Sequence, residues 1–336
     1  MDLGGMEKGL NELFTGLCHD KVKISDLEDI TVGWETRIIA FTLTRPKETS
    51  ELVVRLYGGV GAAAKAQWEF HIMSRLSAEG YPVPKVYTCS VESEALGSPF
   101  LIMERIEGST LWDVFFTSPR EKWSDVLAIN ARLMTRLHDV DPTKIFPSRL
   151  GYATRQRVLE CIDGEAKSLD MNGLLREFAP IMQWLESASP ALVESPLCVI
   201  HRDLHPRNIL LQRDGSHVVI DWGGSRLGDF REDLCWTGLL TATFTDDSLK
   251  DAFYRAYMKF SHRTVENIDY FEAFSALRRL ADASISLKAG PEARGMRPEA
   301  TEQVRQNRLH YSRVYGRLVE VTGIRLPRVE ELFSCG

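Results

Sequence analysis

One stretch near the middle of this 336-residue chain constrains its fold more than any other. The apolar run "LCVI" (197–200) is followed by the polar cluster "HRDLHPRN" (201–208), and then by two apolar runs, "ILLQ" and "HVVI", joined by "RDGS". Short apolar runs on either side of a glycine-containing turn are typical of a β-hairpin. The pattern predicts that Asp203, Asn208 and Asp221 come together at one end of this hairpin.

These three side chains offer two carboxylates and one amide oxygen. Oxygen ligands of this kind suit a hard divalent cation such as Mg²⁺, and one carboxylate can stay outside the metal shell as a base toward a hydroxyl. Phosphoryl transfer from ATP needs this division of roles, because the protein mainly positions groups and neutralises charge. The kinase signature H-R-D-x-x-x-x-N with a later Asp is matched by His201, Arg202, Asp203, Asn208 and Asp221.

The first hundred residues predict a small sheet with one helix. Residues 35–58 contain two apolar, partly alternating runs separated at "TRPKETS", which indicates two strands and a turn. A helix is expected over 61–80, where large apolar residues recur at helical spacing before Gly80. Two further strands are expected within 81–93 and 98–108.

The remainder of the chain has a different character. Residues 121–140 form a strongly amphipathic helical pattern, and helical patterns return over 154–188 and from 230 onward. Between them, only 197–222 is rich in strand-forming residues. We therefore predict a mainly helical second part into which the hairpin is inserted.

Composition narrows the class of protein. Hydrophobic residues make up 44% and charged residues 26%, which is ordinary for a globular protein. A net charge of −6 disfavours broad nucleic-acid binding. Six scattered cysteines without a CxxC pair indicate neither a disulfide framework nor a cysteine-paired zinc site. No secretory signal and no apolar run of about 20 residues is seen, so we expect a cytoplasmic protein that does not span a membrane.

A family resemblance then becomes evident. The stretch "HRDLHPRNILL…VVIDWGGSRLGDFREDL" resembles the aminoglycoside phosphotransferase and choline kinase-like superfamily of small-molecule kinases. "ELVVRLYGG" is similar to its nucleotide-contacting strand, "AQWEFHIMSRLSAEGYPVPKVY" to its helix and next strand, and "FLIMERIEGSTL" to its hinge. Residues 1–30 and those beyond about 290 resemble the family only loosely.

The resemblance implies an α+β, bilobal, protein kinase-like fold. Its N-terminal lobe, residues 1–104, would hold an antiparallel sheet plus one helix and bind the nucleotide. Its larger, mainly helical C-terminal lobe, residues 105–336, would carry the catalytic hairpin and bind the acceptor. The implied reaction transfers the γ-phosphate of ATP, or of GTP, to a hydroxyl of a small molecule with Mg²⁺ as cofactor.

The resemblance also implies roles for single residues. Asp203 would be the catalytic base or hydroxyl-orienting residue, and Asn208 and Asp221 would hold Mg²⁺ against the phosphates. Arg55 stands where protein kinases carry a lysine, and Glu69 would be its ion-pair partner on the helix. A guanidinium can still join a carboxylate to a phosphate.

The same resemblance places a hinge at Met103, with the backbone of Glu104 and Ile106 facing the adenine. One feature departs from the protein kinases: there is no GxGxxG, and "DITVGWETR" offers only Gly33 for a loop over the phosphates. Relatives often carry a degenerate loop at this point.

Parts of this pattern also occur in proteins of other functions. His201 and His205 frame Asp203 as H-x-D-x-H, a pattern that a zinc or iron hydrolase could use. A protein kinase would need an activation segment, but only about ten residues separate Asp221 from the next predicted helix, and no A-P-E motif follows. A nucleotide-binding regulatory protein or pseudokinase stays an alternative, although the base and both metal ligands are present.

The acceptor is less constrained. The end of the chain is rich in cations, which favours a neutral or anionic metabolite over a polycationic antibiotic, unless these charges simply cover helix surfaces. The cations are Lys288, Arg294, Arg297, Arg305, Arg308, Arg313, Arg317 and Arg325, against Glu292, Glu299, Glu302 and Glu320. A choline-like acceptor would need aromatic residues, but Tyr254, Tyr257, Tyr270 and Phe274 recur at helical spacing and are predicted to be core.

Two acidic residues after the hairpin have a structural interpretation. Asp229 and Asp233, in "GDFREDL", are predicted to cap the following helix or to tie down the hairpin. Trp222 is predicted to pack in the core.

Overall fold

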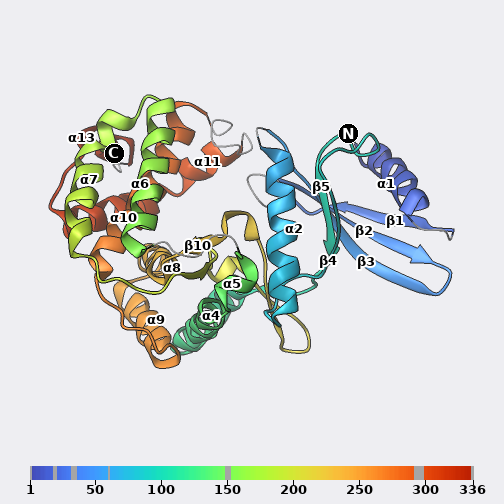
Figure 1. The fold of residues 1–336 in the computed structure, drawn as a ribbon, viewed down its shortest axis with the longest axis horizontal. Coiled ribbons are helices and arrows are strands. Elements are labelled where there is room, and N and C mark those ends of the chain that lie inside the picture. The colour runs from blue at the N-terminus through green and yellow to red at the C-terminus, as the bar shows by residue number, and fades with distance from the viewer. Residues whose placement is uncertain are drawn as a thin grey trace. The chain divides into compact units, whose positions relative to one another are not determined.

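The computed structural model describes residues 2–17, 21–31, 36–59, 61–147, 153–290 and 299–333, and it divides into two compact units (Figure 1). The first unit comprises Met1–Gly108 together with Leu210–Gly223. The second comprises Ser109–Ile209 and most of the chain from Gly224 onward.

The first unit is built on a five-stranded antiparallel sheet with strand order β1-β2-β3-β5-β4. Its strands are β1 (Lys23–Asp29), β2 (Arg37–Arg45), β3 (Glu48–Leu56), β4 (Val86–Ser90) and β5 (Phe100–Glu104). Two helices accompany the sheet: α1 (Leu3–Leu17) and α2 (Ala62–Ala78). In Figure 1 they lie against opposite faces.

Alternation along the strands decides which side chains each helix meets, because successive residues of a strand point to opposite faces. Leu52 and Val54 of β3 pack with the α1 side, where Phe14 lies 5.9 Å from Phe41 between ring centres. Arg55 has the opposite parity and so points toward α2. This parity places a charged residue of β3 beneath the helix.

The predicted elements of this unit are confirmed. The two strands joined near Pro46 are β2 and β3, the helix expected over 61–80 is α2, and the two later strands are β4 and β5. The sequence did not reveal α1 and β1. Strand β1 is mostly exposed and irregular, since its register shifts between Ser25 and Glu28 and Asp26 has a positive φ of 55°.

The second unit is mainly helical, as predicted. Its helices are α3 (Leu111–Thr117), α4 (Trp123–His138), α5 (Pro142–Ile145), α6 (Thr154–Met171), α7 (Leu175–Ala188), α8 (Phe230–Phe244), α9 (Asp247–Phe260), α10 (Ile268–Lys288), α11 (Glu299–Gln306), α12 (Arg308–Thr322) and α13 (Pro327–Phe333). Its short strands are β6 (Ser109–Thr110), β7 (Cys198–Ile200) and β10 (Arg226–Gly228), of which β10 and β7 pair with each other.

Helix α10 lies at the centre of this unit's core. Apolar residues are buried on several of its sides, among them Phe271, Phe274 and Leu277, and α6, α7 and α12 contribute to the same cluster. A helix that is apolar nearly all round is typical of a core position. Tyr270 and Phe274, and also Tyr257 on α9, are at most 4% exposed, which confirms that these aromatics are core residues.

The predicted hairpin is confirmed. Strand β8 (Ile209–Leu211) is joined to β9 (His217–Val219) through a turn in which Gly215 has a φ of 82°, a conformation that favours glycine. The N–H of Val219 then donates to the Pro82 carbonyl at 2.8 Å, which joins β9 to the segment before β4 within the first unit. Trp222 is fully buried and packs edge-on against Tyr81, as predicted.

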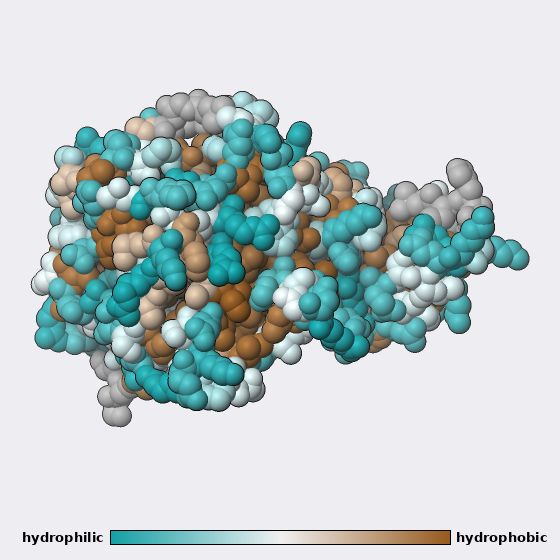
Figure 2. All heavy atoms as spheres, turned by 90° about the horizontal axis from the view of Figure 1, so that it is seen from below, coloured by the Kyte–Doolittle hydropathy of each residue, from teal (hydrophilic) through white to brown (hydrophobic). Residues whose placement is uncertain are grey.

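The surface mixes hydrophilic and apolar residues on the face that Figure 2 shows. Across the described ranges, no helix is both long enough and apolar enough to cross a lipid bilayer. Four cysteines fall within those ranges, at positions 89, 161, 198 and 235, and each is a free thiol.

Candidate active site

The polar segment 201–208 folds as a tight loop in the second unit, between β7 and β8. Buried Leu204 anchors it, because its carbonyl accepts hydrogen bonds from Asn130 Nδ2 at 3.2 Å and from Thr237 Oγ1 at 2.7 Å. The loop ends in a 3₁₀ turn, Pro206–Asn208, whose N-terminus is capped by His205. The loop is thus held by groups from α4 and α8.

The Asp203 side chain is held by contacts with three other side chains. Its Oδ1 accepts the indole N–H of Trp236 at 2.7 Å and lies 3.2 Å from His205 Nε2. Its Oδ2 accepts Asn208 Nδ2–H at 3.0 Å. A carboxylate has about four acceptor positions, so Oδ2 retains one for a hydroxyl, and the side chain is 40% exposed.

The surroundings of Asp203 keep it ionised. Burial acts to raise its pKa, but His205, His201 and the Trp236 hydrogen bond together lower the pKa below its ordinary value. The Asp203 carboxylate therefore carries a full negative charge at neutral pH and is a weak base.

Asn208 is oriented by the same carboxylate. Its Nδ2 group donates both to Asp203 Oδ2 and, at 2.9 Å, to the Asp203 carbonyl, and the residue is 9% exposed. Because its donor side is used in this way, its Oδ1 points elsewhere, and no residue in the described ranges donates to it. The amide oxygen is thus available to a cation.

The loop is tied to α8 by a buried carboxylate. Asp233 accepts the backbone N–H of His201 at 2.8 Å and of Arg202 at 2.5 Å, and it lies 3.2 Å from His138 Nε2. Burial acts to raise the pKa of Asp233, but His138 and the His201 N–H lower it below its ordinary value. Asp229 caps α8 through the N–H of Arg231. Both structural roles predicted for these aspartates are confirmed.

A second group of charges lies in the first unit. Arg55 of β3 places Nη1 3.4 Å from Glu69 Oε2 on α2 and Nη2 2.8 Å from Asp221 Oδ1. Burial acts to lower the pKa of Arg55, but Glu69 and Asp221 raise it, which locks the guanidinium in its charged form. The structure brings these three predicted residues together.

The group formed by Arg55, Glu69 and Asp221, called here the Arg55 group, still has polar atoms that can bind ligands. The buried Arg55 Nε has no hydrogen-bond partner among the described residues. Asp221 is 45% exposed and receives the Arg55 hydrogen bond on one oxygen only. Since one arginine faces two carboxylates, the group has a net negative charge and suits a cation together with an anionic ligand.

Tyr57 and Gly223 fix the position of Glu69, and the sequence did not single them out for this. The Tyr57 hydroxyl donates to Glu69 Oε2 at 2.6 Å, and a Cβ at Gly223 would lie only 2.6 Å from Glu69 Oε1. Burial and the charge of Glu69 raise the pKa of Tyr57. Tyr57 directly follows β3, two residues after Arg55, and this spacing is the signal that could have revealed the pairing, because extended backbone puts both side chains on one face.

The predicted hinge comprises the end of β5 and the residues that follow it in the first unit. Met103, Glu104 and Ile106 are all partly buried. The N–H of Glu104 donates to the Lys85 carbonyl at 2.8 Å, whereas the N–H of Ile106 donates to no group in the described part of the chain. Gly33, predicted to lie in a loop over the phosphates, falls outside the described residues.

The two histidines of the loop have structural contacts. His201 Nδ1 accepts the N–H of Asp203 at 3.2 Å, and His205 Nδ1 accepts the N–H of Arg207 at the same distance. Within the described ranges, no group of three or more histidine, cysteine or acidic residues is arranged to hold a metal ion. The zinc or iron hydrolase alternative therefore has no structural support.

Two arginines beside the loop carry charge that the fold does not fully neutralise. Arg278 of α10 is 8% exposed, stacks 4.5 Å from the ring centre of Trp236, and donates from Nη2 to the Arg202 carbonyl at 3.4 Å. No carboxylate of a described residue comes within 4.0 Å of Arg278, and its buried Nη1 has no partner. Arg202 Nη2 lies 4.0 Å from Glu165.

The two arginines also repel each other. The charge of Arg278, followed by burial, lowers the pKa of Arg202 to about 9. Trp236 connects this pair to Asp203, since the indole offers its face to Arg278 and its N–H to the carboxylate. Asp233 and Trp236 are three residues apart on α8, a spacing that puts both on one helix face and could have pointed to Trp236.

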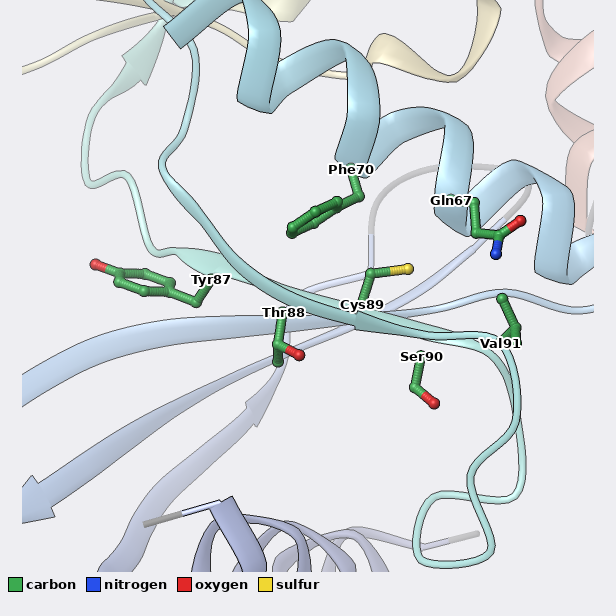
Figure 3. Close-up of a pocket in the computed structure, with 7 residues that line it drawn as sticks. All are labelled: Gln67, Phe70, Tyr87, Thr88, Cys89, Ser90 and Val91. Atoms are coloured by element: carbon green, nitrogen blue, oxygen red, sulfur yellow. The ribbon is translucent and has the colours of Figure 1, made fainter. Parts of the chain in front are cut away.

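A hollow of about 460 Å³ lies elsewhere in the first unit, between α2 and β4 (Figure 3). It is lined by Gln67, Phe70, Tyr87, Thr88, Cys89, Ser90 and Val91. None of the predicted site residues belongs to this lining, so it is separate from the Arg55 group.

Comparison with known protein families identifies a family of phosphotransferases. The model of the phosphotransferase enzyme family matches residues 26–309 of this chain. Of the curated proteins, acyl-CoA dehydrogenase family member 10 of Mus musculus is 24% identical to this chain. That match includes 62% of this chain and only 21% of the relative, so the chain spans about a fifth of the relative's length.

Solved structures show the same fold. A Ralstonia eutropha JMP134 protein provisionally assigned as an aminoglycoside phosphotransferase has a TM-score of 0.64 at 19% identity, covering 91% of this chain and 97% of that one. A thermostable mutant of aminoglycoside phosphotransferase APH(4)-Ia with ADP and hygromycin B gives 0.61 at 17%, covering 92% and 98%. A GDP and kanamycin complex of APH(2")-IIIa gives 0.59 at 14%, covering 89% and 98%. The predicted α+β, kinase-like fold class is confirmed.

Proposed function

This chain belongs to the phosphotransferase enzyme family, and from that premise we propose that it transfers the γ-phosphate of ATP or GTP to a hydroxyl of a small molecule. The observation that carries the proposal is the Asp203 carboxylate, which is held by Trp236, His205 and Asn208 and yet keeps one acceptor position.

Asp203 orients the acceptor in this proposal. The hydroxyl donates its hydrogen bond to Oδ2, which fixes the oxygen for attack on the γ-phosphorus. Because the pKa of Asp203 is low, the carboxylate is a poor base toward an intact hydroxyl, and it takes the proton late. A late proton transfer agrees with the loose transition state of phosphoryl transfer.

The first unit receives the nucleotide. Arg55, held in its charged form by Glu69, offers its unpartnered Nε and its guanidinium edge to the phosphate oxygens. Asn208 and Asp221 each keep a carbonyl or carboxylate oxygen for Mg²⁺, whose ligand preference they fit. Bound there, Mg²⁺ would neutralise phosphate charge.

In this proposal the two lobes have different functions. We assign nucleotide binding to residues 1–104 and acceptor binding with catalysis to residues 105–336. The free N–H of Ile106 and the backbone of Glu104 would recognise the adenine edge, with Met103 beside it. ADP and GDP in the complexes of related structures support a nucleotide donor, and hygromycin B and kanamycin support a small-molecule acceptor.

The proposal is tested in two steps on the full chain. Calorimetric titration with Mg–ATP and Mg–GTP measures nucleotide binding. Release of ADP or GDP is then followed across sugars, amino alcohols, nucleosides, hydroxy acids, sugar phosphates and aminoglycosides, with Asp203→Asn as the control.

We expect nucleotide binding in both proteins and acceptor-dependent release in the wild type alone. Absence of Mg–nucleotide binding by a folded protein contradicts the proposal. Binding without any release that depends on Asp203 favours a regulatory protein or pseudokinase instead.

A further inference from the structure

The strongest unexplained feature is the cation pair formed by Arg202 and Arg278 in the second unit. Arg278 has five N–H donors, and among the described residues it makes one hydrogen bond, a long one of 3.4 Å to the Arg202 carbonyl. Buried guanidinium groups are normally matched by a carboxylate, because desolvating an unpaired charge is costly. Stacking on Trp236 recovers only part of that cost.

Arg202 adds a second, independent observation. Its backbone has a φ of 70°, in the left-handed region that glycine adopts freely and that disfavours a long side chain. A residue kept in a strained conformation beside a candidate catalytic group suggests that its side chain has a function. Arg202 Nε is also buried without a partner in the described part of the chain.

Several arginines near the end of the chain do not behave in this way. The sequence drew attention to them, but Arg305 pairs with Glu302, Arg317 with Glu272 and Glu320, and Arg325 with Glu330. For these, the surface or structural interpretation holds. Unlike them, Arg202 and Arg278 lie beside the catalytic loop, and each has a buried guanidinium nitrogen without a partner among the described residues.

We propose that Arg202 and Arg278 bind an anionic group of the acceptor, so that the substrate is a hydroxy compound carrying a carboxylate or a phosphate. This inference rests on the proposed kinase function and specifies its acceptor. A planar guanidinium pair matches both anions through paired N–H···O bonds. An anion placed there also offsets the repulsion between the two arginines.

The position of the pair limits the acceptor further. Arg202 directly precedes Asp203, and Arg278 lies on the face of the indole whose N–H binds Asp203 Oδ1. The anionic group of the acceptor therefore lies about one indole ring from the hydroxyl that receives the phosphate. Small hydroxy acids and monophosphate esters of polyols or sugars have this spacing.

The binding experiment uses inorganic phosphate as the probe, titrated calorimetrically into the full chain. In one arm, Mg–ADP saturates the nucleotide site; in the other, a non-hydrolysable Mg–ATP analogue does so. The variants are Arg278→Met, Arg202→Gly and, as a matched loss of one positive charge, Arg305→Gln, whose side chain is 61% exposed.

We expect saturable phosphate binding by the wild type in both arms, weakened about tenfold or more in Arg278→Met and Arg202→Gly. Arg305→Gln should bind like the wild type. Equal binding by all four proteins, or no saturable binding by the wild type, overturns the proposal. Binding that persists with ADP and disappears with the ATP analogue also overturns it, because the pair would then hold the transferred phosphoryl group.

A kinetic comparison tests the substrate class with chemically matched acceptors: gluconate against sorbitol, and glycerol 3-phosphate against glycerol. The charged member of a pair should have a kcat/KM about tenfold or more above its neutral partner, and the preference should fall in Arg278→Met. A neutral or cationic acceptor used equally well by the wild type and Arg278→Met contradicts the anionic class while leaving the kinase proposal intact. Failure of Mg–ATP binding, in contrast, counts against the kinase proposal alone.

Discussion

The two charged groups of this protein, one in each unit, are balanced in opposite ways. In the first unit, Arg55 lies between the carboxylates of Glu69 and Asp221, so the single cation is outnumbered. In the second unit, Glu165 lies 4.0 Å from Arg202, and no carboxylate of a described residue lies within 4.0 Å of Arg278. The pKa of Arg55 is accordingly raised, whereas that of Arg202 is lowered to about 9.

The sign of the excess charge in each group indicates whether that group can bind a cation or an anion. A site with excess carboxylate gains from a cation, which fits the Mg²⁺ expected at Asp221. A site with excess guanidinium gains from an anion. Both deficits are explained together by a reaction whose donor arrives with a metal ion and whose acceptor arrives with a negative charge.

The largest effect on stability should come from comparing the two buried arginines. Arg55→Met leaves Glu69, which is 2% exposed, without its cation, so we expect a loss of about 3–5 kcal/mol in the free energy of unfolding. Arg278→Met removes a charge without a carboxylate partner, and we expect a change of less than about 1 kcal/mol. Urea denaturation measures both. Equal losses of stability in Arg55→Met and Arg278→Met would contradict the difference in charge balance between the two groups.

Asp233→Asn should rank next, at about 3 kcal/mol, because the variant weakens two charge-assisted bonds to the loop backbone and the contact with His138. The folded-state pKa of Asp233 is lowered, so its contribution is complete above its unfolded value of 3.8 and is lost as the pH falls through the folded value. The difference between variant and wild type should therefore stay constant from about pH 8 to 5. A difference that already shrinks between pH 7 and 6 would show that the pKa of Asp233 is raised, and not lowered, in the folded protein.

Tyr57→Phe should have a smaller effect. It removes one hydrogen bond to a buried carboxylate, worth about 1–2 kcal/mol, and loosens Glu69 without changing a charge. Because Glu69 positions Arg55, we expect a weaker affinity for Mg–ATP and an unchanged KM for the acceptor. Nucleotide titration and acceptor kinetics separate the two. A change confined to the acceptor KM would contradict this positioning role.

Arg202→Gly should have a small effect of opposite sign. Glycine relieves the positive φ of 70° and removes the repulsion from Arg278, so we expect a gain of about 1 kcal/mol in stability at pH 7. The same change should weaken anion binding. A destabilised Arg202→Gly protein would mean that the side chain holds the loop together and that its strain serves the fold.

Much of this architecture can be predicted from local sequence. Hydrophobic periodicity located α2, β2, β3 and the hairpin, and the kinase signature located Asp203, Asn208 and Asp221. The pairing of Arg55 with Glu69 followed from the family's strand and helix. Asp229 could be assigned because helix caps are specified by residues only a few positions apart.

The rest depends on contacts between distant positions. Trp236 meets Asp203 from 33 residues away, and Arg278 meets the Arg202 carbonyl from 76 residues away. The sequence of α10 does not show which of its buried residues will face the loop. Charge counting over 288–325 likewise missed the imbalance, because Arg305, Arg317 and Arg325 find carboxylate partners while Arg278 does not.

The most direct test of the account follows the phosphoryl group itself. ATP labelled with ³²P at the γ-position is incubated with the wild type or Asp203→Asn and an acceptor that supports ADP release, and the labelled products are separated. We expect a labelled phosphate ester from the wild type and about 10²–10⁴-fold less from Asp203→Asn, which should still bind Mg–ATP. Equal amounts of labelled ester from both proteins would contradict the role of Asp203 and, with it, the proposed mechanism.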